Sequence, residues 1–200
     1  MKLIEVRETL EKLNQPAFSL QDIVGILQIE NTNASQIMNR LVEAGSLVKL
    51  KRGLWAWPKV DPFVISAYLT APLPSYVSLQ SALFYHGLID QIPTFCYVVT
   101  LGRKQIQQTP LGVFSIHHIN VNFFNEYETH YDPYYQLATP EKALLDYFYL
   151  GRFEPSIFGK LPELDITNIN SKKMRQMIDL IDHAGIKTHI ILKLKKYGIF

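Results

Sequence analysis

The chain has 200 residues, of which 48% are hydrophobic and 12% aromatic, and its formal net charge is only +2. This balance fits one or two globular domains and excludes extensive disorder, and the single cysteine, Cys96, excludes an internal disulfide and a cysteine-rich zinc site. No run approaches the roughly 18 apolar residues of a membrane span, and charges interrupt the apolar positions of residues 1–8, so we expect a cytoplasmic protein without a signal peptide.

The first elements in chain order predict a helix-turn-helix with a wing. Residues 3–13 predict a helix with one apolar side, formed by Leu3, Val6, Leu10 and Leu13. Ser19 can cap a second helix, whose apolar side is Leu20, Ile23, Val24 and Leu27. After the polar residues 28–31, a third helix from near Thr32 to Gly45 has an apolar side of Ala34, Ile37, Met38 and Leu41. Two strands, 47–51 and 54–57, flank a turn at Arg52 and Gly53, which completes a winged helix-turn-helix in residues 18–58.

The polar side of the third helix carries side chains that read bases. A period of 3.6 residues places these side chains opposite the apolar stripe: Thr32, Gln36, Asn39, Arg40 and Glu43, with Asn33 and Ser35 at the edges. Asparagine and glutamine pair with adenine and arginine pairs with guanine, while the basic wing would contact phosphates. The predicted DNA-binding residues are Thr32, Asn33, Ser35, Gln36, Asn39, Arg40, Lys49, Lys51 and Arg52.

An ordinary three-helix module for protein contact is the alternative interpretation of this region. The exposed face of the third helix carries few charged side chains, fewer than is usual for a helix that binds DNA. We favour DNA because the polar helix face and the basic wing occur together. Trp55 and Trp57 are expected to cover the core of the wing and the domain junction rather than to stack on bases.

The second half begins at the proline-containing stretch 58–62, which predicts a boundary between domains 1–60 and 61–200. Asp61 and Pro62 predict a helix to about residue 70, and Ser78 and Gly87 can cap and end the next helix. Strands are expected over 95–100 and 113–119, with a turn at 109–112 before the second strand. Residues 120–135 carry no clear pattern.

The last part of the chain predicts three helices. Thr139 and Pro140 open the clearest one, which is apolar enough to be buried, and two others cover 171 to about 184 and about 187 to 197. Basic side chains gather here: Lys172, Lys173, Arg175, Lys187, Lys193, Lys195 and Lys196. They suit contact with a polyanion, but solvated lysines on a terminal helix are an equally good interpretation.

Catalytic constellations are missing from the sequence. There is no Gly-rich phosphate loop, nucleophile elbow or metalloprotease helix. His117 and His118 lie in a predicted strand, so their rings point to opposite faces and cannot share a metal. His86 is expected to satisfy carbonyls at a helix end, and Cys96 to be a small buried hydrophobe. A nuclease-like core would need an acid and a lysine on the strand after Asp90, and that strand has neither. We therefore expect no enzyme, no metal and no cofactor.

Two segments resemble the AbiEi family of antitoxins and transcriptional regulators in type IV toxin–antitoxin systems. They are YVSLQSALFYHGLI (residues 76–89) and ATPEKALLD (residues 138–146), and the turn 109–112 with the strand after it adds to the resemblance, which covers most of residues 1–150. The resemblance implies a winged helix that binds inverted repeats in its own promoter. It also implies a C-terminal domain that counters a nucleotidyltransferase-like toxin, often without a stable complex.

The sequence therefore predicts an α+β protein with two domains. Residues 1–60 form a winged helix-turn-helix that binds double-stranded DNA, and residues 61–200 form a mixed α/β antitoxin-type domain with C-terminal helices. One alternative is a stand-alone regulator whose second domain senses a ligand or a partner. A metal-dependent nuclease is a less favoured alternative.

Overall fold

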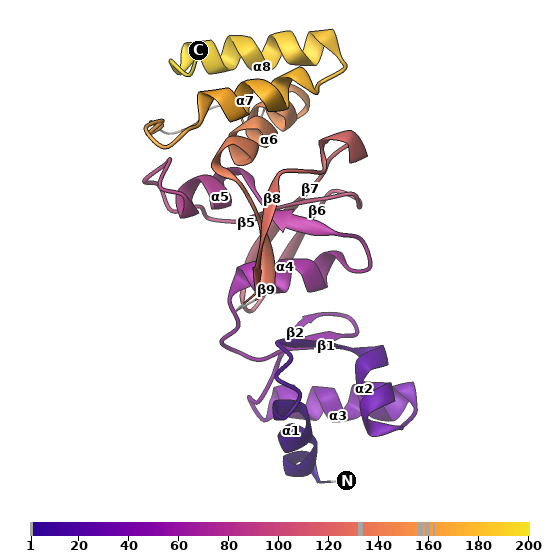
Figure 1. Cartoon of the computed structure of the whole chain (residues 1–200). Coiled ribbons are helices and arrows are strands. Elements are labelled where there is room, and N and C mark those ends of the chain that lie inside the picture. The colour runs from indigo at the N-terminus through magenta and orange to yellow at the C-terminus, as the bar shows by residue number, and fades with distance from the viewer. Residues whose placement is uncertain (1, 132–133, 156–157, 159–160, 162) are drawn as a thin grey trace.

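The computed structural model describes residues 2–131, 134–155, 158, 161 and 163–200 (Figure 1). Helices and strands occur together in both halves, so the expected α+β class is confirmed. The N-terminal helices lie at one end of the molecule and the C-terminal helices at the other, with a larger sheet between them (Figure 1).

Three helices and a small antiparallel sheet make up the first half. The helices are α1 (Leu3–Glu11), α2 (Leu20–Leu27) and α3 (Asn31–Glu43), and the strand order is β1 (Ala17–Ser19), β3 (Leu54–Ala56) and β2 (Val48–Lys51). The sequence does not predict β1, because three residues are too few to show an alternation. One core joins these elements through Val6, Leu10, Phe18, Ile23, Ala34, Met38, Leu41, Leu47 and Trp55.

Local hydrogen bonds fix the ends of α2 and α3. The backbone amide of Asp22 donates to Ser19 Oγ at 3.2 Å, and the Ser19 amide donates to Asp22 Oδ2 at 2.7 Å, so the expected cap is confirmed as a reciprocal capping box. Gly45 follows α3 with φ of 70°, a left-handed conformation that glycine adopts without steric penalty.

Two helix boundaries in the first half differ from expectation. Helix α1 ends at Glu11, so Leu13 is 45% exposed instead of extending the apolar side. Helix α3 begins at Asn31, one residue before Thr32, which adds a polar residue to its first turn.

The larger sheet has six strands in the order β6-β7-β5-β4-β9-β8. Its strands are β4 (Ser75–Val77), β5 (Cys96–Thr100), β6 (Gln105–Thr109), β7 (Gly112–His118), β8 (Tyr127–Tyr131) and β9 (Tyr134–Ala138). Strand β5 is parallel to β7 and β4 is parallel to β9, while the other neighbours are antiparallel. Strands β5 and β7 confirm the predictions. The sequence does not predict the other four strands, β4, β6, β8 and β9. Strand β6 is mostly polar and exposed, so it shows no apolar alternation.

Alternation along the central strands sends neighbouring residues to opposite faces of this sheet. Val98 and Phe114 pack toward α4 (Pro62–Thr70), whereas Val99 belongs to the core beneath α5 (Leu79–Tyr85) and α6 (Pro140–Phe153). Helices α7 (Ser171–Asp179) and α8 (Ala184–Lys196) cover α6 (Figure 1). A short 3-10 helix, η1 (Val121–Phe123), precedes β8.

The last two helices have different boundaries from those expected. Helix α7 ends at Asp179, and residues 184–185 open α8 instead of stopping α7. The reason is a cap that the sequence analysis misses, because Nδ1 of His183 accepts from the Ile186 amide at 3.4 Å.

The small sheet of the first half is buried on both faces. Trp55 and Phe18 point into the three-helix core. The alternate residues form a second core with α4, β5 and β7, and the members of this shared core are Ala17, Leu50, Leu54, Ala56, Ile65, Leu69, Val98, Phe114 and Ile116. Trp57 Nε1 donates to the Gln15 carbonyl at 2.9 Å, so both tryptophans have the packing role that the sequence predicts. The shared core crosses the expected boundary at residue 60.

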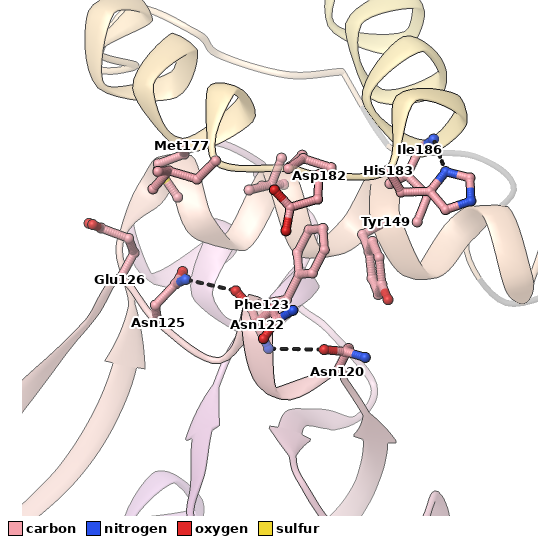
Figure 2. A pocket seen from close by; sticks show the side chains of 13 residues that line it. Asn120, Asn122, Phe123, Asn125, Glu126, Tyr149, Met177, Asp182, His183 and Ile186 are labelled. Atoms are coloured by element: carbon pink, nitrogen blue, oxygen red, sulfur yellow. Dashed lines mark hydrogen bonds between the residues drawn. The ribbon is translucent and has the colours of Figure 1, made fainter.

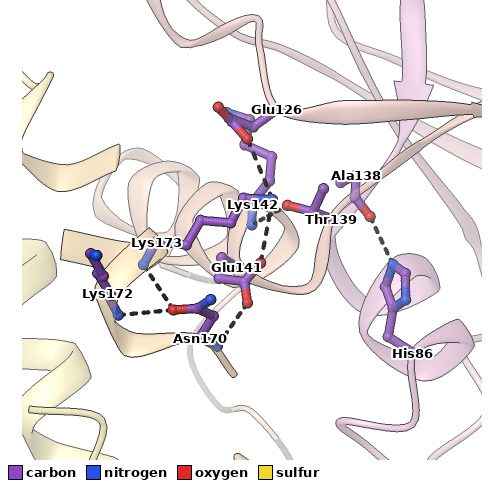
Figure 3. A network of polar contacts seen from close by, with 9 residues as sticks. All are labelled: His86, Glu126, Ala138, Thr139, Glu141, Lys142, Asn170, Lys172 and Lys173. Atoms are coloured by element: carbon purple, nitrogen blue, oxygen red, sulfur yellow. Dashed lines mark hydrogen bonds and ion pairs between the residues drawn. The ribbon is translucent and has the colours of Figure 1, made fainter. Parts of the chain in front are cut away.

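A polar network fastens α7 to the start of α6 (Figure 3). Thr139 Oγ1 accepts from the Lys142 amide, which confirms the expected cap. Glu141 Oε1 accepts from the backbone amide of Asn170 at 2.8 Å, and the Lys173 amino group lies 3.8 Å from Glu141 Oε2. Lys173 also lies 3.5 Å from Glu126. Lys187, another member of the basic C-terminal group, pairs with Asp179 at 2.7 Å. At least two members of this group are therefore engaged within the chain.

Candidate nucleic-acid interface

Helix α3 presents a continuous polar face to solvent. Ala34, Met38 and Leu41 are at most 2% exposed and point into the three-helix core. The opposite side chains are exposed: Thr32, Asn33, Gln36, Asn39 and Arg40. Ser35 is half-buried, which fits its expected place at the edge of the face. The structure thus brings the six predicted α3 residues onto one surface.

This polar face is not used to hold the fold together. Within the described part of the chain, no hydrogen bond or ion pair involves the side chain of any of the six residues. Asn31 is also exposed on the first turn of α3. The sequence analysis misses Asn31 because it places the helix start one residue later. An unengaged row of amide and guanidinium groups on a packed helix is free to bond an external ligand.

The β2–β3 hairpin, which the sequence predicts to be a wing, carries exposed positive charge. Lys49 and Arg52 are exposed, and Arg52 lies in the turn between β2 and β3. The Gly53 carbonyl accepts from the Leu20 amide at 2.9 Å, so this turn is tied to the start of α2. Gly53 itself has φ of 73°, a left-handed turn conformation.

Lys51 is placed differently from its two basic neighbours. Its Nζ donates to the Leu69 carbonyl at the end of α4, at 2.8 Å. Burial lowers the pKa of this amino group. Helix carbonyls in the last turn lack intrahelical partners, so a lysine there satisfies one of them. Lys51 therefore joins the two halves of the chain, and Lys49 and Arg52 are the better candidates for a phosphate contact.

Residues 76–89 and 138–146 meet at a buried ion pair. Lys142 Nζ lies 2.6 Å from Asp146 Oδ1, and both side chains are completely buried. Asp146 Oδ2 accepts from the Tyr76 hydroxyl at 3.0 Å and from Ser78 Oγ at 2.8 Å. The Lys142 amino group also donates to the Phe123 carbonyl. The predicted cap by the Ser78 side chain is therefore wrong. Its hydroxyl donates to Asp146 and makes no capping hydrogen bond to α5.

Burial sets the electrostatics of this ion pair. Desolvation raises the pKa of Asp146, and Lys142 and the two hydroxyl donors oppose that shift. Desolvation, followed by the charge on Asp146, raises the pKa of Tyr76, so the phenol stays a neutral donor. The cluster is a closed set of donors and acceptors beneath α6, with no exposed member, and its evident role is to lock α6 onto β4.

A serine, a histidine and a glutamate lie in the order of a nucleophile, a base and an orienting acid. Ser115 Oγ lies 2.8 Å from His117 Nε2, and His117 Nδ1 lies 3.4 Å from Glu154 Oε2. However, His117 is 0% exposed and packs against the rings of Tyr97 and Phe158, which also contact each other. Because His117 has no exposed surface and Ser115 is also buried, the arrangement is a packing unit in this conformation.

Structural contacts also describe two further histidines and the single cysteine. His118 is exposed and opposite in direction to His117, as predicted. The prediction that His86 satisfies carbonyls of its own helix is wrong. Its Nε2 lies 2.8 Å from the carbonyl oxygen of Ala138 at the end of β9. Cys96 is only partly buried and packs against the apolar core. Desolvation raises the pKa of its thiol far above the ordinary value, which disfavours the reactive thiolate.

A surface cavity of about 210 Å³ lies between η1 and the α7–α8 connection (Figure 2). Two of its polar side chains are engaged within the loop. Asn120 Oδ1 accepts from the Asn122 amide at 2.9 Å, and Asn125 Nδ2 donates to the Asn122 carbonyl at 3.2 Å. The ring of Phe123 stacks on Tyr149 at 4.1 Å. These contacts shape the loop.

Comparisons with known proteins leave the chain without an assigned family. Neither the models of known protein families nor the curated proteins include a match to it. Among the described residues, no three His, Cys, Asp or Glu side chains gather in a way that could hold a metal ion. The helices of that same part of the chain include none with the length and apolar character for crossing a membrane.

Proposed function

We propose that residues 1–60 are a winged helix-turn-helix that binds double-stranded DNA, with α3 in the major groove. The single observation that carries the proposal is the exposed, unengaged polar face of α3 beside an exposed basic wing tip. Gln36 and Asn39 suit adenine and Arg40 suits guanine, while Lys49 and Arg52 suit backbone phosphates.

We further propose that the protein is an antitoxin-type repressor of its own operon. The resemblance of residues 76–89 and 138–146 to the AbiEi family supports this role, and so does the position of both segments in one buried cluster of the second half. The proposed DNA is an inverted repeat in the promoter, which two copies of the chain would bind with two-fold symmetry. The second half would counter a nucleotidyltransferase-like toxin without requiring a stable complex, by a route other than catalysis.

A gel-shift titration with DNA from upstream of the gene tests the DNA proposal. Gln36→Ala, Asn39→Ala and Arg40→Ala together should abolish the preference for this DNA over a random duplex of equal length. Lys12→Gln is a matched control, because Lys12 is exposed at the end of α1 and away from the polar face of α3. An unchanged preference in the triple variant would remove α3 as the reading helix.

Co-expression tests the antitoxin proposal separately. A nucleotidyltransferase-like gene adjacent to this one should arrest growth when expressed alone, and co-expression of this chain should relieve the arrest. Relief should persist in the triple α3 variant, because it depends on the second half. If no such neighbour exists, or if relief fails while the DNA preference is intact, the stand-alone regulator becomes the better description.

A further inference from the structure

A small polar cavity is lined by side chains of α6 and α8, among others. These two helices lie at the end of the molecule opposite to α3 (Figure 1). Its volume is about 60 Å³, which is several times the space that one ordered water requires, about 10–15 Å³ by the same measure. Aromatic rings form part of its wall, including those of Phe148 and Phe158. The cavity is separate from both the proposed DNA surface and the buried ion pair.

Two buried polar atoms in the cavity wall have no partner among the described residues. They are the hydroxyl of Tyr147 and Nε2 of His189. Tyr147 is only 2% exposed, and burial followed by neighbouring tyrosines raises its pKa, so the hydroxyl is a neutral donor. A buried donor without an acceptor is unfavourable, by roughly 1–3 kcal/mol, and such a group in a polar cavity points to a missing acceptor.

Two lysines of α8 bring positive charge to one side of the same space. His189, Lys193 and Lys196 line it from α8 at a spacing of four and three residues, which places them on one face of the helix. Burial, and then the charges of Lys193 and Arg152, lower the pKa of His189. No acidic residue is among those that line the cavity in the described part of the chain. The missing acceptor is therefore expected to be an anion.

We propose that this cavity binds a phosphate-sized oxyanion, either free inorganic phosphate or the terminal phosphate of a nucleotide. Tyr147 and His189 hydrogen-bond its oxygens inside the cavity, and Lys193 and Lys196 balance its charge from α8. A tetrahedral oxyanion offers acceptors in several directions, which matches donors converging from two helices. The volume has room for one such group but not for a nucleoside, so the rest of a nucleotide would lie outside. The site is independent of DNA binding.

Isothermal titration calorimetry of the full chain at constant ionic strength tests this site with inorganic phosphate in one arm and AMP in the other. We expect saturable binding in at least one arm, and the stronger arm identifies the source of the phosphate. Tyr147→Phe and Lys193→Gln should each weaken binding about tenfold or more, which corresponds to about 1.4 kcal/mol. Lys195→Gln is the matched control, because Lys195 lines a separate groove with Arg175 on the other side of α8, and it should bind like the wild type.

Two results would overturn the proposal. One is the absence of saturable heat with both phosphate and AMP. The other is equal binding by the wild type, Tyr147→Phe and Lys193→Gln, which would mean that water fills the cavity and that phosphate binds elsewhere. Lys193 is exposed, so its replacement leaves the packing intact and keeps the test informative if Tyr147→Phe disturbs the fold.

Discussion

The amino group of Lys142 lies 2.6 Å from Oδ1 of Asp146, and neither side chain has any exposed surface. The two residues are four apart on α6, so they face the same side of the helix. Asp146 also accepts hydrogen bonds from the hydroxyls of Tyr76 and Ser78. The pair therefore connects residues that are about 70 positions apart in the sequence.

Removing one member of this pair should destabilise the protein strongly. Asp146→Ala leaves a buried lysine without its counter-ion, and a broken buried pair is destabilising by about 3–5 kcal/mol. Urea unfolding followed by circular dichroism measures the loss. The double variant Lys142→Met, Asp146→Leu should be more stable than Asp146→Ala, because no buried charge remains. A double variant as unstable as Asp146→Ala would mean that the charges are not the reason for the loss.

A double-mutant cycle can separate the two roles considered for Ser78. Because its hydroxyl donates to a carboxylate, Ser78→Ala should lower the free energy of unfolding by about 1.5–3 kcal/mol. In the Asp146→Ala background the same substitution should have almost no effect. A helix cap would instead lose about the same free energy in both backgrounds, so equal losses would argue for capping.

The three basic residues of the wing should behave as two classes in DNA binding. Lys49→Gln and Arg52→Gln should each weaken binding to every duplex and lower the salt slope by about 1, because each removes one phosphate contact. Lys51→Met should leave the slope unchanged and reduce stability, because Lys51 bonds the Leu69 carbonyl. Titrations at several salt concentrations, with urea unfolding in parallel, measure both quantities. A reduced slope for Lys51→Met would place its amino group on DNA instead.

Stability should fall when the pH is lowered below about 6.5, the ordinary value for histidine. Burial is the main influence on His117 and lowers its pKa in the folded state, although Glu154 opposes the shift. As the pH falls below 6.5 the unfolded chain binds the proton first, so unfolding is favoured until the lower folded pKa is reached. The slope from this residue is at most about 1.4 kcal/mol per pH unit.

His117→Gln isolates that contribution from the other five histidines. The difference in unfolding free energy between pH 7 and pH 5.5 should be smaller in the variant than in the wild type. Equal differences would mean that His117 does not titrate in this range. A larger difference in the variant would mean that Glu154 outweighs burial and that protonation stabilises the folded state.

Local signals explain which elements were predictable. The starts of α2, α4 and α6 each have a capping side chain or a proline at the first helical position, and these features act within one turn. The polar face of α3 is also predictable, because the 3.6-residue period of a helix places its polar side chains opposite the apolar ones. Edge strands such as β6 expose alternating residues to solvent on both faces, so no apolar pattern marks them.

The roles of Ser78 and Lys51 depend on partners that are distant in the chain. Ser78 has the local signature of a cap, but the structure brings Asp146 from 68 positions away and the stronger charge-assisted bond prevails. Lys51 has the signature of a wing anchor, yet packing of the wing on α4 brings it to a carbonyl 18 positions away. Neither contact can be inferred from spacing, because each depends on how two elements pack.

Because the small sheet is buried on both faces, residues 1–60 cannot be transferred to another protein as an independent unit. Residues 1–60 moved onto an unrelated protein would carry the uncovered side chains of Ala17, Leu50, Leu54 and Ala56, an apolar patch that favours self-association. Recombination could reuse residues 1–60 only together with α4 and the strands that face the small sheet, or with an acceptor protein that offers a matching apolar surface. The two halves of the chain would therefore be retained together during evolution.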